Sequence, residues 1–298
     1  MCSERYLAID VGGTAIKYVL TDRTAKINKI NEIKTNRNKK ELFNSLDEII
    51  APNMDDINGI ALSFPGKIDA EKGIVHTAGA LNGISNLPIK SILEEKYSKP
   101  VWIENDGKCG VLAEFWKGNL SDVKNGVFIG IGTEIAGGII LEGKLYRGSF
   151  GSSGEFSSMM NCLKNPDNEM RFGKIGGHKN MISYYGSGKC IDSYEFFDKY
   201  QNRDETAQKA LKEYSRIIAA GIINIQSVLD VEKFCIGGGI SAQDALIDEI
   251  RKSLQEFIAI KSSEAINEPA IEKCHFGNGA GCVGALYNFL IMEKLIWD

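Results

Sequence analysis

The sequence predicts an α/β protein whose two halves share one design and face a common cleft. Residues 6–20 and 127–141 each combine an apolar strand, a Gly-Thr tip and an apolar return strand, the pattern of a β-hairpin with a glycine turn. Around these hairpins, short apolar runs that predict strands occur together with longer segments at helical spacing. A chain of 298 residues with 43% hydrophobic residues can bury two ordinary cores, so we expect two domains.

The first half predicts further strands and a helix. Residues 25–34 predict a third strand, although their isoleucines recur every third residue. Residues 39–51 predict a helix, because their leucines and isoleucines have helical spacing and the segment stops before a proline. Residues 59–64 predict a buried strand that enters a tight Pro-Gly turn. The small and turn-forming residues of 77–88 predict a loop.

The middle of the chain predicts a strand that runs directly into a helix. Residues 100–103 form a buried apolar run, and residues 107–118 carry an apolar stripe at helical spacing. The Glu-Asn-Asp sequence of 104–106 therefore lies where the strand meets the helix. The second hairpin follows, and the glycine- and serine-rich residues 148–155 predict a flexible stretch.

The last part of the chain predicts a long helix and two strand-turn-helix units. Residues 159–200 mix glycines, charges and aromatic residues without a clear period, so no element is assigned there. Residues 204–229 keep a 3.6-residue apolar period and predict a long helix. Residues 233–236 predict a strand, followed by three glycines and by Ser241, which we expect to cap the next helix. The segment from Cys274 onward predicts a strand end, a glycine turn and a closing helix.

Composition excludes several classes of protein. The 35 basic and 39 acidic residues give a net charge of −4 without a long run of either sign, so we expect no nucleic-acid partner and no membrane-surface patch. The first ten residues carry charges where a signal peptide is apolar, and no segment approaches the roughly 20 apolar residues of a membrane span, so we expect a cytoplasmic protein. The seven cysteines show no paired spacing, so we expect mostly reduced, buried thiols.

Three glycine-rich strand ends point to nucleotide binding. Backbone N–H groups at glycines can approach an anion closely, and a threonine hydroxyl adds a donor, which suits phosphate. The three corners are Gly12, Gly13 and Thr14; Gly132 and Thr133; and Gly237, Gly238 and Gly239. We expect the first two to hold phosphates and the third, which opens a helix, to contact the base or ribose. For any single glycine, the alternative is a turn or close packing.

Seven motifs share the order and spacing of one known family. They are DVGGTAIK at 10–17, FPG at 64–66, END at 104–106, GTEIAGG at 132–138, GSSGE at 151–155, IGGG at 236–239 and GNGAGCVGA at 277–285. Together they resemble the ROK family of sugar kinases, repressors and open reading frames, over nearly the whole chain. The resemblance implies the actin-like ATPase fold of the hexokinases, with two ribonuclease H-like domains hinged over a cleft. It implies a small domain of residues 1–105, completed by 283–298, and a large domain of 106–282.

By this resemblance the chain is an ATP- and Mg²⁺-dependent kinase for the 6-hydroxyl of a hexose, with glucose as the default. Phosphoryl transfer to a hydroxyl needs an aligned nucleophile, a carboxylate to accept its proton, and donors around the phosphoryl oxygens. In the family the aspartate of END is the general base, so Asp106 takes this role; a helix cap is the alternative from its position alone. Asp10 matches the residue that holds Mg²⁺ through water, with a turn-forming aspartate as the alternative.

The resemblance also assigns the residues that contact the sugar. Vicinal hydroxyls need paired donors and acceptors, and a pocket built for a hydroxyl rejects an analogue that lacks it. Taken one at a time, several of these residues could equally be ordinary solvent-exposed side chains. The implied sugar-contact residues are Gly66, Asn82, Asn105, Asp106, Glu155 and Ser158.

One departure from the family pattern concerns zinc. Ser158 stands where many members have a histidine that contacts the sugar and binds zinc. The downstream cysteine cluster is missing too, because Cys162, His178 and Cys190 are widely spaced and include no CxxC pair. We therefore expect no zinc site, and in this the chain is similar to zinc-lacking β-glucoside kinases.

A second departure concerns the phosphate-binding tip. Glu134 and Ala136 replace family glycines there. A carboxylate close to the γ-phosphate would be repelled, so Glu134 points away, meets the metal, or weakens the kinase; we expect it to point away.

Three alternatives to a glucose kinase are considered. A β-glucoside such as cellobiose and N-acetylmannosamine are alternative substrates, because serine in place of histidine can widen the pocket. A DNA-binding repressor is disfavoured, because only about five residues precede the first strand and no basic helix is present. A non-catalytic, sugar-sensing regulator is the alternative of another class; Glu134 and Ser158 permit it, and Asp106 argues against it. Family members often form dimers, so we expect a homodimer.

Overall fold

Two sheets of the same topology organise the protein. The computed structural model describes residues 4–79, 81, 83–161, 168–186, 191–260 and 265–296. The strands of the first sheet are β1 (Tyr6–Val11), β2 (Ala15–Thr21), β3 (Asn31–Lys34), β4 (Gly59–Phe64) and β8 (Val101–Asn105). Those of the second are β9 (Gly126–Ile131), β10 (Ile135–Leu141), β11 (Lys144–Leu145), β12 (Lys233–Gly237) and β13 (Ala270–Lys273). A small third sheet contains β5 (Ile68–Asp69), β6 (Ile74–Thr77) and β7 (Ser85–Leu87).

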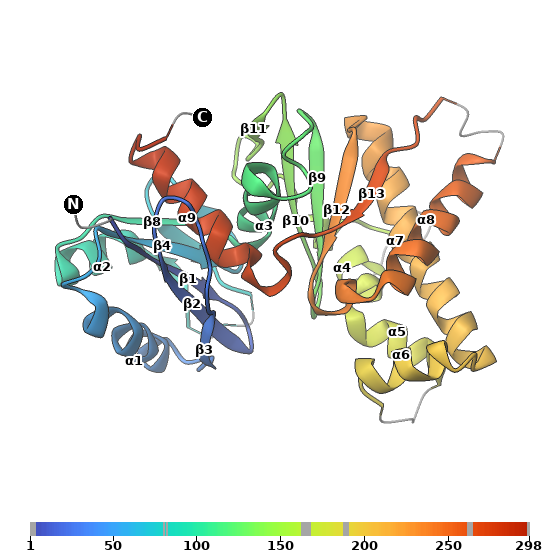
Figure 1. The fold of residues 1–298 in the computed structure, drawn as a ribbon, viewed down its shortest axis with the longest axis horizontal. Coiled ribbons are helices and arrows are strands. Elements are labelled where there is room, and N and C mark those ends of the chain that lie inside the picture. The colour runs from blue at the N-terminus through green and yellow to red at the C-terminus, as the bar shows by residue number, and fades with distance from the viewer. Residues whose placement is uncertain are drawn as a thin grey trace.

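The two large sheets repeat one strand order. It is β3-β2-β1-β4-β8 in the first and β11-β10-β9-β12-β13 in the second (Figure 1). In each, the leading strand pairs antiparallel with its hairpin partner on one side and parallel with a later strand on the other. The predicted repeat of one design is therefore confirmed, with the two glycine tips at equivalent places.

Helices cover both faces of each sheet. They are α1 (Lys39–Ile50), α2 (Ile89–Tyr97), α3 (Asp106–Lys117), α4 (Phe172–Gly176), α5 (His178–Tyr185), α6 (Ser193–Gln201), α7 (Glu205–Leu229), α8 (Asp244–Ile258) and α9 (Ala280–Met292). Helix α9 packs on β1, β4 and β8, and α3 packs on β9 and β10. The same two helices pack on each other, so they join the two halves (Figure 1).

Strand β1 shows why these strands read as continuous apolar runs. Leu7, Ile9 and Val11 point into the core that α1 completes, while Tyr6 and Ala8 point into the core that α9 completes. Because both faces are covered, neighbouring residues are both apolar, as expected for strands in a sheet with helices on either side.

The contact between α3 and α9 depends on one glycine. A Cβ built at Gly284 of α9 would lie 1.8 Å from the carbonyl oxygen of Cys109 of α3, which no side chain allows. The absence of a side chain at Gly284 therefore lets the backbones of the two central helices approach closely.

Several predicted boundaries are corrected by the structure. The third strand spans only β3, and Ile27 and Ile30 before it pack instead against the core around α9. The predicted loop at 77–88 contains the short strand β7. The prediction that Ser241 caps a helix is wrong: its hydroxyl donates to the Gly238 carbonyl at 2.8 Å inside a 3₁₀ turn (Gly239–Ala242), and α8 begins later.

Other predictions are confirmed or completed. The long helix α7 begins after Asp204, whose side chain accepts a hydrogen bond from the Ala207 N–H at 2.8 Å. The unassigned stretch at 159–200 contains α4, α5 and most of α6. Helix α1 ends one residue early, at Ile50, and a 3₁₀ turn (Ala51–Asn53) carries the chain past the proline. Among the residues the structure describes, no helix combines the length and apolarity needed to cross a membrane.

Candidate active site

The END motif lies at the junction of β8 and α3, as predicted. Asn105 is the helix N-cap: its side-chain oxygen accepts the Lys108 N–H at 3.0 Å. Its amide group donates to the Gly66 carbonyl at 2.9 Å and to Asp106 Oδ1 at 3.0 Å. The alternative that Asp106 caps the helix is wrong, because Asn105 does so. Asp106 Oδ1 accepts the Gly107 N–H at 2.8 Å as well as the Asn105 amide, and these two donors orient the carboxylate.

The carboxyl group of Asp106 is poised to exchange a proton near neutral pH. Its pKa is raised to about 7: burial raises it most and the negative charges of Asp10 and Glu155 add to this, while the Gly107 N–H and the positive charge of Lys108 act in the opposite direction. A general base works best when its pKa is near the working pH. The structure therefore brings Asp106, Asp10 and Glu155 into one electrostatic cluster.

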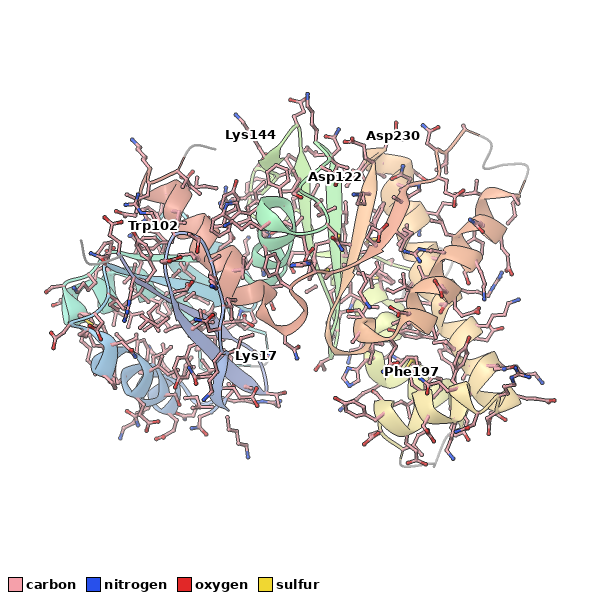
Figure 2. The ribbon with its side chains drawn as sticks, in the orientation of Figure 1. Lys17, Trp102, Asp122, Lys144, Phe197 and Asp230 are labelled. Atoms are coloured by element: carbon pink, nitrogen blue, oxygen red, sulfur yellow. The ribbon has the colours of Figure 1, made fainter. Side chains whose placement is uncertain are left out.

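Asp10 joins this cluster from the end of β1. Ser63, fully buried on β4, donates to Asp10 Oδ1 at 2.6 Å. Burial raises the pKa of Asp10, and the Ser63 hydroxyl and the charge of Lys17 lower it; Lys17 faces Asp10 across the hairpin and is labelled in Figure 2. A Cβ built at Gly281 would lie 2.3 Å from the Asp10 carboxyl carbon, so the start of α9 closes over it.

Lys108 is a site residue that the sequence reasoning missed. Its side chain is 2% exposed, and its Nζ lies 3.9 Å from Glu155 Oε1. That Nζ makes no hydrogen bond to the residues that the structure describes. A buried ammonium with unengaged donors, next to the predicted sugar-contact residue Glu155, can donate a hydrogen bond to a substrate oxygen. The only sequence signal is a lysine between small residues in the first turn after END.

The second and third glycine corners meet in one pocket. A cavity of about 370 Å³ is lined by Gly132 and Thr133 at the tip of the second hairpin and by Gly239 after β12. Its other walls are apolar at Ile131, Phe197 and Ile240 and polar at His178, Ser193, Tyr194 and Gln243. Phe197 projects from α6 (Figure 2). Such a mixture of flat apolar walls and a few polar groups suits a nucleoside.

Backbone contacts shape this pocket. His178 donates its N–H to the Gly132 carbonyl at 3.0 Å, and its ring Nδ1 lies 2.8 Å from the same oxygen. Gly238 has φ +95°, and a Cβ there would lie 2.1 Å from the Ile131 carbonyl oxygen, so this corner requires glycine. His178 thus lines this pocket; Cys162 and Cys190, named with it above, lie outside the described residues.

The first glycine corner lies at the end of the other sheet and is not part of that pocket's lining. The hydroxyl of Thr35 donates to the Gly12 carbonyl at 2.7 Å, and the Thr35 N–H donates to the Thr14 carbonyl at 2.9 Å. Nε of Arg37 donates to the Gly13 carbonyl at 3.3 Å, which places an exposed guanidinium at the tip. Arg37 was not predicted, and it adds positive charge where phosphates are expected.

Glu134 contacts the segment that follows Glu155, a predicted sugar-contact residue. Ser157 Oγ donates to Glu134 Oε2 at 2.7 Å, and Arg171 Nη2 lies 3.9 Å from Glu134 Oε1. Ser157 belongs to a 3₁₀ turn (Phe156–Ser158) that follows Glu155. The carboxylate at the phosphate tip is therefore engaged by a neutral donor and a cation.

The structure describes two of the remaining predicted sugar-contact residues, Gly66 and Ser158. A Cβ at Gly66, where φ is +94°, would lie 2.1 Å from the Thr77 carbonyl oxygen, so the turn after β4 requires glycine. Ser158 has an exposed side chain, and its N–H donates to the Glu155 carbonyl at 3.1 Å. Asn82 lies outside the described residues.

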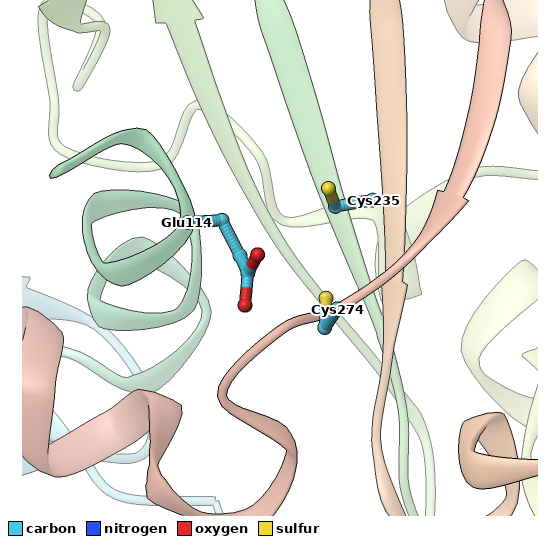
Figure 3. A group of neighbouring side chains, drawn as sticks. All are labelled: Glu114, Cys235 and Cys274. Carbon is cyan, nitrogen blue, oxygen red and sulfur yellow. The ribbon is translucent and has the colours of Figure 1, made fainter. Parts of the chain in front are cut away.

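One group of potential metal ligands among the described residues lies on α3, on β12 and in the connection after β13. Glu114 on α3 faces Cys235 on β12 and Cys274 after β13, all three buried (Figure 3). The Glu114 carboxylate already accepts the N–H groups of Asn119, His275 and Phe276 at 2.9–3.0 Å. Burial raises the pKa of the Cys274 thiol. We therefore assign Glu114 a structural role: it ties the connection between β13 and α9 to the end of α3.

Comparison with known proteins identifies the family. The family model described as "ROK family" matches residues 6–291. The chain belongs to the ROK family. A β-glucoside kinase of Listeria monocytogenes is 30% identical over 299 residues, which cover 96% of this chain and 98% of that protein. An N-acetylmannosamine kinase of Haemophilus influenzae is 27% identical, with coverage of 95% and 94%.

A solved structure supports the same assignment. A ROK family protein from Streptococcus pneumoniae in complex with sucrose superposes with a TM-score of 0.86 at 29% identity, covering 98% of this chain and 100% of that one. The protein therefore has the actin-like ATPase fold of this family, with two α/β domains, as predicted.

Proposed function

We propose that the protein is an ATP- and Mg²⁺-dependent kinase that phosphorylates the 6-hydroxyl of a hexose, with glucose as the default substrate. The observation that carries the proposal is the oriented carboxyl group of Asp106, with a pKa of about 7, in one cluster with Asp10 and Glu155. The sugar-kinase names of the ROK relatives support it.

In this mechanism Asp106 accepts the proton of the sugar's 6-hydroxyl as the oxygen attacks the γ-phosphorus of ATP. The new bond joins the sugar oxygen to that phosphorus, the bond from the phosphorus to the β,γ-bridging oxygen breaks, and ADP leaves. Asn105 positions Asp106, because its side-chain amide donates a hydrogen bond that orients the Asp106 carboxylate. Glu155 and Lys108 would bind hydroxyls of the sugar, because an acceptor and a donor lie side by side there.

The nucleotide would extend from the pocket to the glycine corners. The base and ribose would occupy the cavity beside Ile240 and Phe197, and the phosphates would meet the tips at Gly132–Thr133 and Gly12–Thr14. Asp10 offers a hard carboxylate oxygen, which suits Mg²⁺ held through water; when bound, the ion would neutralise charge on the phosphates.

The experiment is a coupled assay of ADP release over a panel of hexoses, hexosamines and β-glucosides, with Asp106→Asn beside the wild type. Sugar-dependent turnover that the variant loses is the expected result. A β-glucoside such as cellobiose is the second candidate, favoured by the similarity to the Listeria β-glucoside kinase. If no sugar stimulates turnover while one still raises the melting temperature, the protein is a non-catalytic sugar sensor instead.

A further inference from the structure

A second cavity, of about 420 Å³, is lined by two segments that adjoin predicted sugar-contact residues in the sequence. One wall consists of residues 67–71 and His76 from the β5–β6 hairpin, and the opposite wall consists of residues 147–151. The two walls come from different halves of the chain. A Cβ built at Gly151 would lie 3.2 Å from the carbonyl oxygen of Ile68, so the walls approach each other closely at one end.

Both walls are tied to the END motif. Lys67 directly follows Gly66, whose carbonyl accepts the amide of Asn105 at 2.9 Å. In the opposite wall, Arg147 Nε donates to Glu104 Oε2 at 2.8 Å, and Glu104 is 1% exposed. The wall that contains Arg147 also leads within a few residues to Glu155. Both walls of the cavity are therefore anchored to the motif at which the hexose is expected.

The charges of the cavity favour a neutral ligand. The guanidinium of Arg147 is engaged by Glu104, and the Asp69 carboxylate accepts the Lys72 N–H at 3.0 Å, a contact that lowers its pKa. Lys67 and Glu71 add one charge of each sign. Since the lining mixes both signs, it selects neither an anion nor a cation.

The cavity also offers an aromatic face. The ring of Phe150 is 83% exposed although it lines the cavity, so one apolar face is open to a ligand. His76, whose Nδ1 lies 2.8 Å from Asn86 Oδ1, presents the other side of its ring nearby. An aromatic face with a few polar groups around it matches a pyranose, which has an apolar C–H face and a rim of hydroxyls.

We infer that this cavity binds the second sugar ring of a disaccharide whose first ring carries the 6-hydroxyl that is phosphorylated. Phe150 stacks on the second ring, and the polar side chains of 67–71 and His76 bind its hydroxyls. The inference rests on the proposed function, because the position of the first ring follows from the role of Asp106. It makes a β-linked glucose disaccharide a better substrate than glucose alone.

The test compares cellobiose with glucose in the wild type and in Phe150→Ala. We expect Phe150→Ala to lower kcat/KM for cellobiose about tenfold, the size of one lost aromatic contact, and to change kcat/KM for glucose less than about twofold. Tyr146→Ala is the matched control: Tyr146 is 47% exposed and precedes the same wall, but it does not line the cavity. It should leave both substrates unchanged.

Calorimetric titration of cellobiose and of glucose into the same proteins, without ATP, separates this inference from the proposed function. If no sugar is turned over, the kinase proposal fails, and tighter binding of cellobiose that Phe150→Ala abolishes would still support the cavity. If glucose is turned over but cellobiose does not bind, the inference is overturned and the kinase proposal stands. An equal effect of Phe150→Ala on both sugars, or none on either, also overturns the inference.

Discussion

The substitution Asp106→Asn should abolish activity and at the same time stabilise the protein. Asparagine has the same shape and can still accept the Gly107 N–H, but it can neither take a proton nor carry a charge. Loss of a general base lowers kcat by about 10²- to 10⁴-fold. The gain in stability follows from the burial that raises the pKa of Asp106.

The magnitude comes from proton linkage. The folded protein holds a proton on Asp106 up to a pH of about 7, whereas the ordinary pKa is 3.8. Between these values the folded state binds more protons than the unfolded state, so the contribution of Asp106 to stability falls as pH rises. At about 1.4 kcal/mol per pH unit the full cost is about 4 kcal/mol. Because Asp106 keeps some exposure, solvent screening reduces this, and we expect about 2 kcal/mol.

The assay is thermal unfolding in Mg²⁺-free buffer at pH 8 and pH 5. About 2 kcal/mol in a chain of this size raises the melting temperature of Asp106→Asn by about 3 °C at pH 8, and by less at pH 5. Asp122→Asn is the control, because Asp122 is an exposed carboxylate paired with Lys233 at 2.6 Å, and it should show no such gain. Activity of Asp106→Asn above a tenth of the wild type, or no gain in melting temperature at pH 8, would refute the reasoning.

Three further predictions follow from individual contacts. Lys108→Met removes the cation that lowers the pKa of Asp106, so the acidic limb of the pH profile of kcat should move to higher pH; an unmoved limb would contradict this. Ser157→Ala frees the Glu134 carboxylate at the phosphate tip, so the KM for ATP should rise several-fold, and adding Glu134→Gln should restore it; failure of that rescue would exclude charge repulsion. Glu114→Gln weakens three partly buried hydrogen bonds and should lower the free energy of unfolding in urea by about 2 kcal/mol. The KM values for sugar and ATP should not change; an altered KM would show that Glu114 also shapes the site.

Sequence periodicity predicted the elements whose pattern is local and long. The two hairpins and α7 each repeat an apolar period over many residues, and each appears within a few residues of its predicted bounds. Strand β7 was missed because it has three residues, two of them exposed, and Asn86 within it has a positive φ. Its pairing with β6 is a tertiary contact that no local period reveals.

Motifs in the sequence identified candidate site residues that lie far apart in the chain. Asp10, Asp106 and Glu155, far apart in the sequence, do form one electrostatic cluster. The helix cap, considered for Asp106 only as an alternative role, belongs to Asn105. Aspartate and asparagine are both good N-caps, and only the geometry shows that the oxygen of Asn105 reaches the Lys108 N–H. The burial of Lys108 could not be predicted, because a lysine near a helix start normally faces solvent.

A structure with glucose and a non-hydrolysable ATP analogue bound is the most direct test of the central claim, that Asp106 accepts the proton of the hydroxyl that is phosphorylated. The account predicts that the sugar's 6-hydroxyl lies within about 3 Å of an Asp106 oxygen and that the γ-phosphate lies in line beyond it, between the two Gly-Thr tips. A 6-hydroxyl bound to another carboxylate, with Asp106 separated from both substrates, would contradict it.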